Sequence, residues 1–205
     1  MGRVKGTKCE RRRLGGLIWM RTGLWLLATF VVSLVFFSSP ITSAQIDFSN
    51  PNYEVLFKNN LRRGFLNLAG KKIGDKGLLI LLQQDFLGDL KKLDLRYNEI
   101  SARGAKQLAS STSFKNLKTL ILKHNFLSDE GSIALAKSSG FTQIKEMQLG
   151  WNEIRDAGAL AFVESKNFPN LEKLDLRGNF LAGKTKEALR SSLSHLKSLR
   201  IFQSE

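Results

Sequence analysis

The sequence predicts an α/β fold: a right-handed β-α superhelical solenoid with a parallel sheet on its concave face and helices on its convex face. Three observations lead to this fold class. One apolar pattern recurs four times at a constant spacing of 27 residues, so each copy is long enough for one strand and one helix. The first half of each copy alternates apolar and polar residues, as a half-buried strand does. The second half carries apolar residues at i, i+3 and i+4, as a helix packed on a sheet does.

Residues 1–44 have the layout of a signal sequence. Residues 24–37 carry no charge, basic residues precede them, and the small residue Ala44 ends the segment. A membrane-spanning helix needs about 20 apolar residues, so we expect cleavage after Ala44 and export to the periplasm or the exterior. The alternative is an uncleaved membrane anchor with the repeat domain outside the cytosol. Met20 would start a compact signal sequence and is a candidate for the true start of translation.

Cysteine usage and charge narrow the function classes. The single cysteine, Cys9, precedes the apolar run, so the exported part has no cysteine for disulfides, thiol catalysis or metal ligation. The sequence also has no Asn-x-Ser/Thr acceptor site for N-glycosylation, which favours a protein exported by a bacterium. The formal charge is +14, of which residues 1–44 contribute +6. The other basic residues are spread along the chain and form no single stripe, which argues against a nucleic-acid-binding protein.

Residues 45–62 are expected to form an N-terminal cap, since the first repeat of a solenoid has no neighbour to cover its apolar side. Residues 63–205 then form a repeat domain of about five 27-residue repeats and a partial C-terminal repeat. The first copy is degenerate: it keeps Leu66 and Leu68 but has Lys71 where later copies have asparagine.

Four regular copies follow, each with the pattern L-x-x-L-x-L-x-x-N-x-L or a close variant. They begin at Leu90, Leu117, Ile144 and Leu171. The final partial copy runs only from Leu199 to Phe202, and little follows to cover it. This C-terminal strand edge is therefore a candidate self-association surface.

The pattern resembles the leucine-rich repeat, and the period with its Gly-Ala-x-x-Leu-Ala second half resembles the ribonuclease-inhibitor-like subclass. The resemblance covers residues 63–202. It implies the solenoid described above and protein–protein interaction as the usual role, without naming a partner.

The positions within each copy have physical roles that agree with this fold. Strand pairs such as Leu93 and Leu95 form one buried face, and the crossover helix turns Ala105 and Leu108 toward the sheet. A glycine recurs just before the apolar i, i+3, i+4 positions of each predicted helix, where close packing or a special backbone angle favours it. Four asparagines are expected to satisfy buried backbone groups at the bend after each strand, and so to belong to the scaffold. They are Asn98, Asn125, Asn152 and Asn179.

The exposed face of the sheet supplies the candidate binding residues. Tyr97, His124 and Trp151 fall at the same position of three consecutive repeats, so with strands about 4.8 Å apart they form a rank of rings. Gly70 and Gly178 occupy the same position in the repeats before and after these three, so we expect the rank to be open at both ends. Exposed aromatic rings beside charged donors are enriched where proteins bind. The other candidate partner contacts are Arg96, Lys123, Arg177, Asp94 and Gln148.

Two further readings of the rank stay open. The rings could merely stack on one another and stabilise the sheet. If they bind a partner, His124 would make the affinity sensitive to pH near its usual pKa, about pH 6–7.

A phosphate-binding pattern, G-x-x-x-x-G-K-[ST], runs from Gly178 to Thr185. The residues within this pattern do not suit a phosphate-binding loop. Asn179 and Leu181 belong to the repeat, and bulky Phe180 occupies a loop that would have to wrap phosphates. We expect no nucleotide to bind here.

Enzyme chemistry has little support in the sequence. His124 and His195 are the only histidines, and no His/Asp/Glu cluster has metal-ligand spacing, so no metal or cofactor is expected. The preferred function is an exported, non-enzymatic protein-binding module that uses the concave face. The alternative is a module that binds an anionic polymer through its basic surface, which salt would weaken far more steeply.

Overall fold

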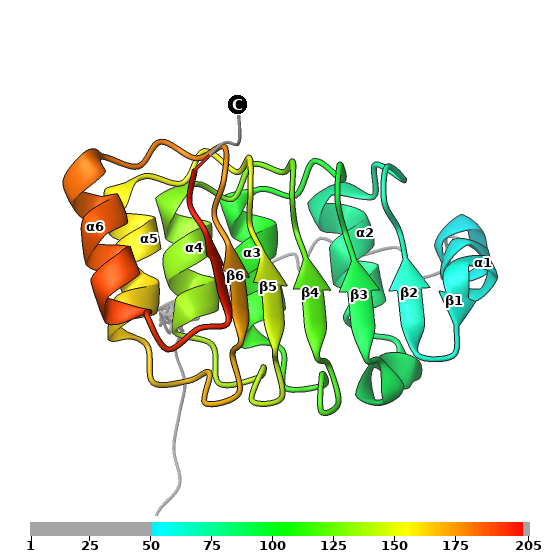
Figure 1. Cartoon of the computed structure of the whole chain (residues 1–205). Helices are drawn as coiled ribbons and strands as arrows, with labels where there is room; N and C mark the ends of the chain where they lie inside the picture. The colour runs from blue at the N-terminus through cyan, green and yellow to red at the C-terminus, as the bar shows by residue number, and fades with distance from the viewer. Residues whose placement is uncertain (1–50, 203–205) are drawn as a thin grey trace, which may run out of the picture. The chain divides into compact units, whose positions relative to one another are not determined.

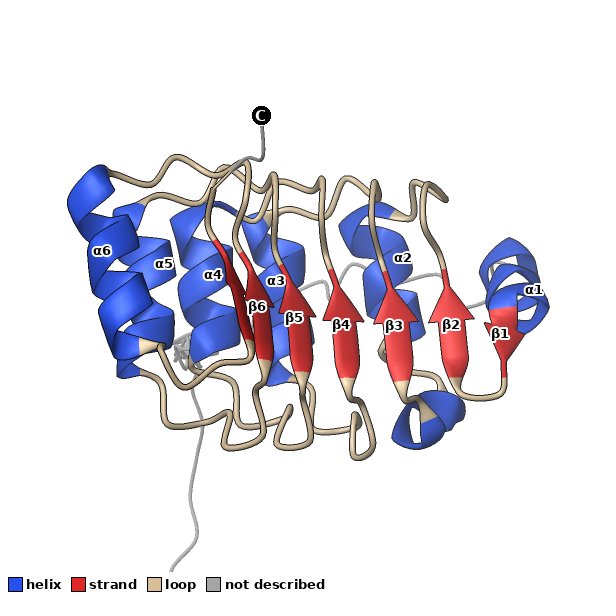
Figure 2. Cartoon of the chain, viewed as in Figure 1, coloured by secondary structure: helices blue, strands red, loops and turns tan. Residues whose placement is uncertain are grey.

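The computed structural model describes residues 51–202, and the side chains from Tyr53 onward. The predicted signal sequence and residues 45–50 of the predicted cap lie outside the described residues. The described chain alternates strands and helices, with the strands side by side in one sheet and the helices along one face of it (Figure 1). Figure 2 shows the same two layers by secondary structure. The fold is the α/β repeat solenoid that the sequence predicts.

Seven strands follow one another in the sheet in chain order, and all neighbours are parallel except β1 and β2. The strands are β1 (Leu61–Arg62), β2 (Phe65–Asn67), β3 (Lys92–Asp94), β4 (Thr119–Ile121), β5 (Glu146–Gln148), β6 (Lys173–Asp175) and β7 (Ser198–Arg200). The helices are α1 (Pro51–Asn60), α2 (Gly74–Leu81), α3 (Ala102–Ser110), α4 (Ser128–Ala136), α5 (Asp156–Glu164) and α6 (Gly183–Ser192), with a short 3-10 helix, η1 (Asp85–Asp89).

The register of the sheet is the one that the 27-residue period predicts. Leu93 of β3 pairs with Leu120 of β4, which pairs with Met147 of β5, and these side chains are fully buried. The last step is two residues shorter, because Leu199 of β7 pairs with Leu174 of β6. One ladder of apolar side chains therefore runs through the core from β2 to β7.

The recurrent glycines before the helix stripes are explained by close packing. A Cβ on Gly131 would lie 2.9 Å from the Cβ of Ala105 on α3, and a Cβ on Gly158 would lie 2.9 Å from the Cα of Asp129 on α4. Neither glycine has the positive φ that would call for glycine on backbone grounds. The glycines thus let consecutive helices approach each other closely.

The two ends of the sheet differ. At the N-terminal end, α1 buries Phe57 in the core and β1 folds back antiparallel on β2. At the other end, β7 is the last strand of the sheet in the described part of the chain, and the nearby Phe202 ring is 48% exposed. Lys186 Nζ and Arg190 Cζ lie 5.3 Å and 5.0 Å from the centre of that ring. Self-association through this edge stays a prediction.

Candidate functional site

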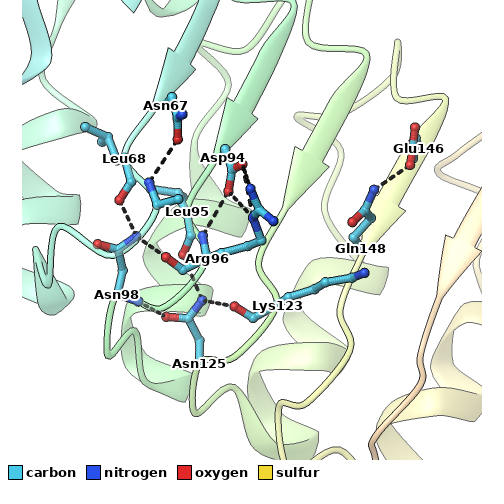
Figure 3. A network of polar contacts seen from close by, with 11 residues as sticks. Asn67, Leu68, Asp94, Leu95, Arg96, Asn98, Lys123, Asn125, Glu146 and Gln148 are labelled. Atoms are coloured by element: carbon cyan, nitrogen blue, oxygen red, sulfur yellow. Dashed lines mark hydrogen bonds and ion pairs between the residues drawn. The ribbon is translucent and has the colours of Figure 1, made fainter. Parts of the chain in front are cut away.

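The asparagines form a hydrogen-bond ladder beneath the turns that follow the strands, and Figure 3 shows the part made by Asn98 and Asn125. Asn125 Oδ1 accepts hydrogen bonds from the backbone N–H groups of Asn98 and Ile100, both at 3.0 Å. Its Nδ2 donates to the carbonyl oxygens of Leu95 and Leu122, both at 2.9 Å. Asn98 and Asn179 make the same kinds of bond to the repeats before them. Each asparagine therefore pairs backbone groups that the turn removes from water.

Asn152 departs from this pattern. Its Nδ2 donates to the carbonyl oxygens of Leu122 and Leu149, at 2.9 Å and 3.0 Å. Its Oδ1 is buried and has no hydrogen-bond partner among the described residues. The ladder is thus incomplete between this repeat and the one before it.

Tyr97, His124 and Trp151 form a continuous stack just beyond β3, β4 and β5. The ring centres of Tyr97 and His124 are 4.2 Å apart with planes inclined by 10°, and those of His124 and Trp151 are 4.7 Å apart with planes inclined by 11°. Tyr97 is 54% exposed. We call these three residues the aromatic rank. Its rings stack as the scaffold reading expects, and they also present an exposed aromatic surface.

The backbone at the aromatic rank is left-handed. Tyr97, His124 and Trp151 have φ values of 54°, 55° and 56°, and Gly70 and Gly178 at the same position have 68° and 70°. Glycine adopts this conformation without strain, whereas bulky residues do so at a cost of about 1 kcal/mol or more each. The turn itself would accept glycine in all five repeats, so the rings are not needed to make the bend.

The rank is open at one end only, which corrects the expectation of two open ends. A Cβ on Gly178 would lie 2.4 Å from Trp151 Nε1, so the indole rests directly on that glycine. At the other end, nothing lies within 4 Å of the Cβ position of Gly70. The free face of the stack is therefore on the Tyr97 side.

Three basic residues beside the aromatic rank are held in ion pairs. Arg96 Nη2 lies 2.8 Å from Asp94 Oδ2 (Figure 3), and Lys123 Nζ and Arg177 Nη2 lie 2.9 Å and 2.8 Å from Asp175 Oδ2. Burial raises the pKa of Asp175, but hydrogen bonds from Arg177 and Lys123 outweigh it and hold that pKa below its usual value. The cations that flank the aromatic rank are thus largely neutralised within the chain.

One expectation about this face is corrected. Asp94 was expected to face a partner, but it is only 2% exposed because the Arg96 guanidinium covers it. Asp175 and Ile121, at the same strand position, are also buried. Gln148 remains partly exposed and donates a 2.5 Å hydrogen bond to Glu146 (Figure 3).

Three residues next to the aromatic rank were missed by the sequence analysis. Phe126 and Phe180 are 52% and 62% exposed. Glu153 has the same position in the repeat that lies between theirs. With the aromatic rank they line a cleft of about 380 Å³. All three directly follow a ladder asparagine, so tabulating that position across the repeats would have revealed them.

Two backbone N–H groups of the phosphate-binding pattern are already paired within the chain. The N–H of Phe180 donates to the carbonyl of Ile154, and the N–H of Ala182 donates to Asp156 Oδ1. Thr185, which would have to reach a metal ion, is 2% exposed and lies inside α6. Among residues 53–202 we find no group of three His, Cys, Asp or Glu side chains that could hold a metal ion. No helix within the described range is both long enough and apolar enough to cross a membrane.

The surroundings of His124 lower its pKa. Partial burial, and then the positive charges of Lys123 and Arg96, lower its pKa below the usual value. In the unfolded chain its pKa is about 6.5, so below that pH the unfolded state binds a proton that the folded state binds less readily. Protonation therefore favours the unfolded state as the pH falls.

We expect the free energy of unfolding to decrease between about pH 7.5 and about pH 5.5, and His124→Gln to reduce that decrease. Urea titrations at both pH values, followed by circular dichroism, measure it. His195→Gln, on an exposed residue, is the matched control. An equal pH response in wild type and His124→Gln would contradict the prediction.

Strand–turn–helix units stacked in parallel, with an asparagine ladder beneath their turns, define a class of protein: a repeat solenoid. Models of the leucine-rich repeat family match residues 89–109, 115–136 and 144–163, and a second leucine-rich repeat model matches residues 170–196. The chain thus contains leucine-rich repeats, as the sequence analysis inferred. These matches do not distinguish the ribonuclease-inhibitor-like subclass.

One solved structure supports the same fold. The tropomodulin C-terminal domain from Caenorhabditis elegans superimposes with a TM-score of 0.53 at 16% sequence identity, over 72% of this chain and 92% of that one. A structure described as leiomodin-1 actin-binding site 2 matches with a TM-score of 0.44 at 16% identity, over 75% of this chain and 78% of that one. A search of curated protein sequences finds no match. At this level of identity the similarity concerns the fold.

Proposed function

We propose that this protein is an exported, non-enzymatic module that binds another protein on the concave face of its solenoid, with the aromatic rank as the anchor. The observation that carries the proposal is the rank itself. Three stacked rings occupy positions where the backbone favours glycine, and Tyr97 remains 54% exposed. Concave solenoid surfaces are the usual binding surfaces of such folds, and exposed aromatic residues are enriched at protein interfaces.

The flanking side chains fit this role. Arg96, Lys123 and Arg177 surround the rank, and the cations of Lys123 and Arg177 lie 5.7 Å and 5.8 Å from the centre of the Trp151 ring. Their ion pairs with carboxylates fix these side chains before a partner arrives, which lowers the entropic cost of binding. In this arrangement Asp94 positions Arg96 and does not touch the partner itself.

The same ion pairs argue against the alternative of an anionic polymer. Asp94 and Asp175 pair with Arg96, Lys123 and Arg177, so the three cations beside the aromatic rank are less available to a polyanion. Binding that disappears as the salt concentration rises would favour the alternative.

The test is an affinity capture from an envelope extract with the full chain as bait, at low and high salt. The triple variant Tyr97→Ala, His124→Ala, Trp151→Ala should bind the captured protein at least about tenfold more weakly, because a few aromatic residues carry most of an interface's energy. Phe202→Ala, which removes an exposed ring away from the rank, is the matched control. Circular dichroism establishes that all variants fold.

Capture that is equal in wild type and the triple variant would contradict binding at the rank. Export has its own measurement, which is N-terminal sequencing of the protein recovered from cells. A mature chain that begins at Gln45 is expected, and a chain recovered intact in the cytosol would contradict export.

A further inference from the structure

The cleft beside the aromatic rank has a distinct chemical character. Its lining includes the rings of the aromatic rank, the exposed rings of Phe126 and Phe180, and one carboxylate, Glu153. A second cleft of about 460 Å³ adjoins it and shares Glu153 and Phe180. Its lining adds Asp129, Glu130 and Arg155, so the two clefts together present three carboxylates and one cation. This region is therefore locally acidic on a chain whose overall charge is +14.

A comparison of equivalent positions in the repeats shows that Glu153 lacks the paired cation that Glu99 has. The residues that follow the asparagine position in successive repeats are Lys72, Glu99, Phe126, Glu153 and Phe180. Glu99 has a cation from the preceding repeat, since Lys72 Nζ lies 3.7 Å from its Oε1. Glu153 has the same left-handed backbone, with φ 59° against 60° for Glu99. In the repeat before Glu153, however, the position that corresponds to Lys72 is occupied by Phe126, which carries no charge.

Within residues 53–202 no cation pairs with Glu153. Arg155, the basic residue that lines the adjoining cleft, lies over the Phe180 ring with its Cζ 5.6 Å from the ring centre. A cation beside aromatic faces and a carboxylate gains from both the ring quadrupole and the opposite charge. The apolar stems of lysine and arginine also pack well on rings.

We infer that the partner supplies this cation: a peptide segment that places a lysine or arginine side chain at Glu153, with apolar residues beside it on Phe126 and Phe180. The inference rests on the proposed function and specifies the chemistry of its partner. Lys123 and Arg177, the cations beside the Trp151 ring, are paired with Asp175. Repulsion by basic residues farther away is screened beyond about 8 Å at physiological salt.

The test selects peptides on the immobilised full chain from a phage-displayed random dodecapeptide library. Enriched sequences are expected to contain Lys or Arg next to apolar residues. Synthetic copies of them are then titrated against a Trp19→Phe, Trp25→Phe background, in which Trp151 is the only tryptophan and its fluorescence reports binding in the cleft.

In this background Glu153→Gln should weaken peptide binding about twofold to fivefold, as expected for loss of one exposed ion pair. Glu99→Gln is the matched control, because it removes the equivalent carboxylate where Lys72 already supplies the cation. It should leave the dissociation constant unchanged. Replacing the peptide's Lys or Arg by glutamine should cost as much as Glu153→Gln, and the two changes together should cost little more.

The outcomes separate this inference from the proposed function. Peptides without a cation overturn the inference, and so do peptides whose binding survives Glu153→Gln. If these peptides no longer bind the aromatic-rank triple variant, that loss of binding still supports the proposed function. Peptides that bind the triple variant as well as wild type contradict both; because that variant lacks Trp151, its binding is measured by the anisotropy of a fluorescent label on the peptide. A selection that enriches no sequence overturns the inference, and the affinity capture then decides on the function.

Discussion

Replacing Asn125 by alanine is expected to lower the free energy of unfolding by about 3–4 kcal/mol, because each buried polar group left without a partner costs about 1–3 kcal/mol. The substitution leaves the N–H groups of Asn98 and Ile100 without their acceptor. It also removes the Nδ2 donor from the carbonyl oxygens of Leu95 and Leu122. Urea denaturation followed by circular dichroism measures the loss.

Asn152→Ala is the matched comparison at the same position of the next repeat. It removes the Nδ2 donor in the same way, but the Oδ1 of Asn152 accepts no hydrogen bond from the described residues, so no N–H group loses a partner. We expect a loss of only about 1–2 kcal/mol. Equal losses at the two positions would show that the acceptor half of the ladder contributes nothing to stability.

Gly178→Ala is expected to destabilise the protein by about 2–4 kcal/mol and to unstack the aromatic rank. The φ of 70° at this glycine costs alanine about 1 kcal/mol. In addition, the new Cβ would lie 2.4 Å from Trp151 Nε1, so the indole has to leave its stack on His124. Losing a stacked pair and repacking the ring costs about 1–3 kcal/mol more.

Gly70→Ala separates the two causes. Gly70 has nearly the same φ, 68°, but nothing lies within 4 Å of its Cβ position. It should cost only the backbone term of about 1 kcal/mol and leave the Trp151 fluorescence unchanged. A fluorescence spectrum of Gly178→Ala identical to that of wild type would mean that the indole does not rest on this glycine. Under the proposed function, Gly178→Ala also weakens partner binding, whereas Gly70→Ala does not.

The fold could be predicted because its determinants are local and repeated. Leu93, Leu120 and Met147 occupy the same place in copies of constant length, so the period alone brings them into register. Alternation along each short strand then assigns one face to the core. The asparagines could likewise be assigned to the bend, because a buried turn needs both donors and an acceptor.

The candidate site was only partly predictable. Equal spacing places Tyr97, His124 and Trp151 in a rank, but it does not say that Trp151 leans onto Gly178 and closes one end. The exposed rings Phe126 and Phe180 follow the turns and lie outside the named strands and helices, where neither the period-2 nor the helical pattern applies. Their approach to the rank depends on how the turns of neighbouring repeats pack.

The sequence by itself determined the repeat, the order and register of the strands, the buried apolar ladder and the place of the asparagines. The reason is that each of these follows from spacing along one chain and from which face of a strand a side chain occupies. Only the tertiary structure decided that Arg96 covers Asp94, that Lys123 reaches Asp175 two strands away, and that Glu153 lacks the cation that Glu99 has. Long side chains choose among partners on neighbouring repeats, and that choice depends on distances across the sheet that no single repeat contains.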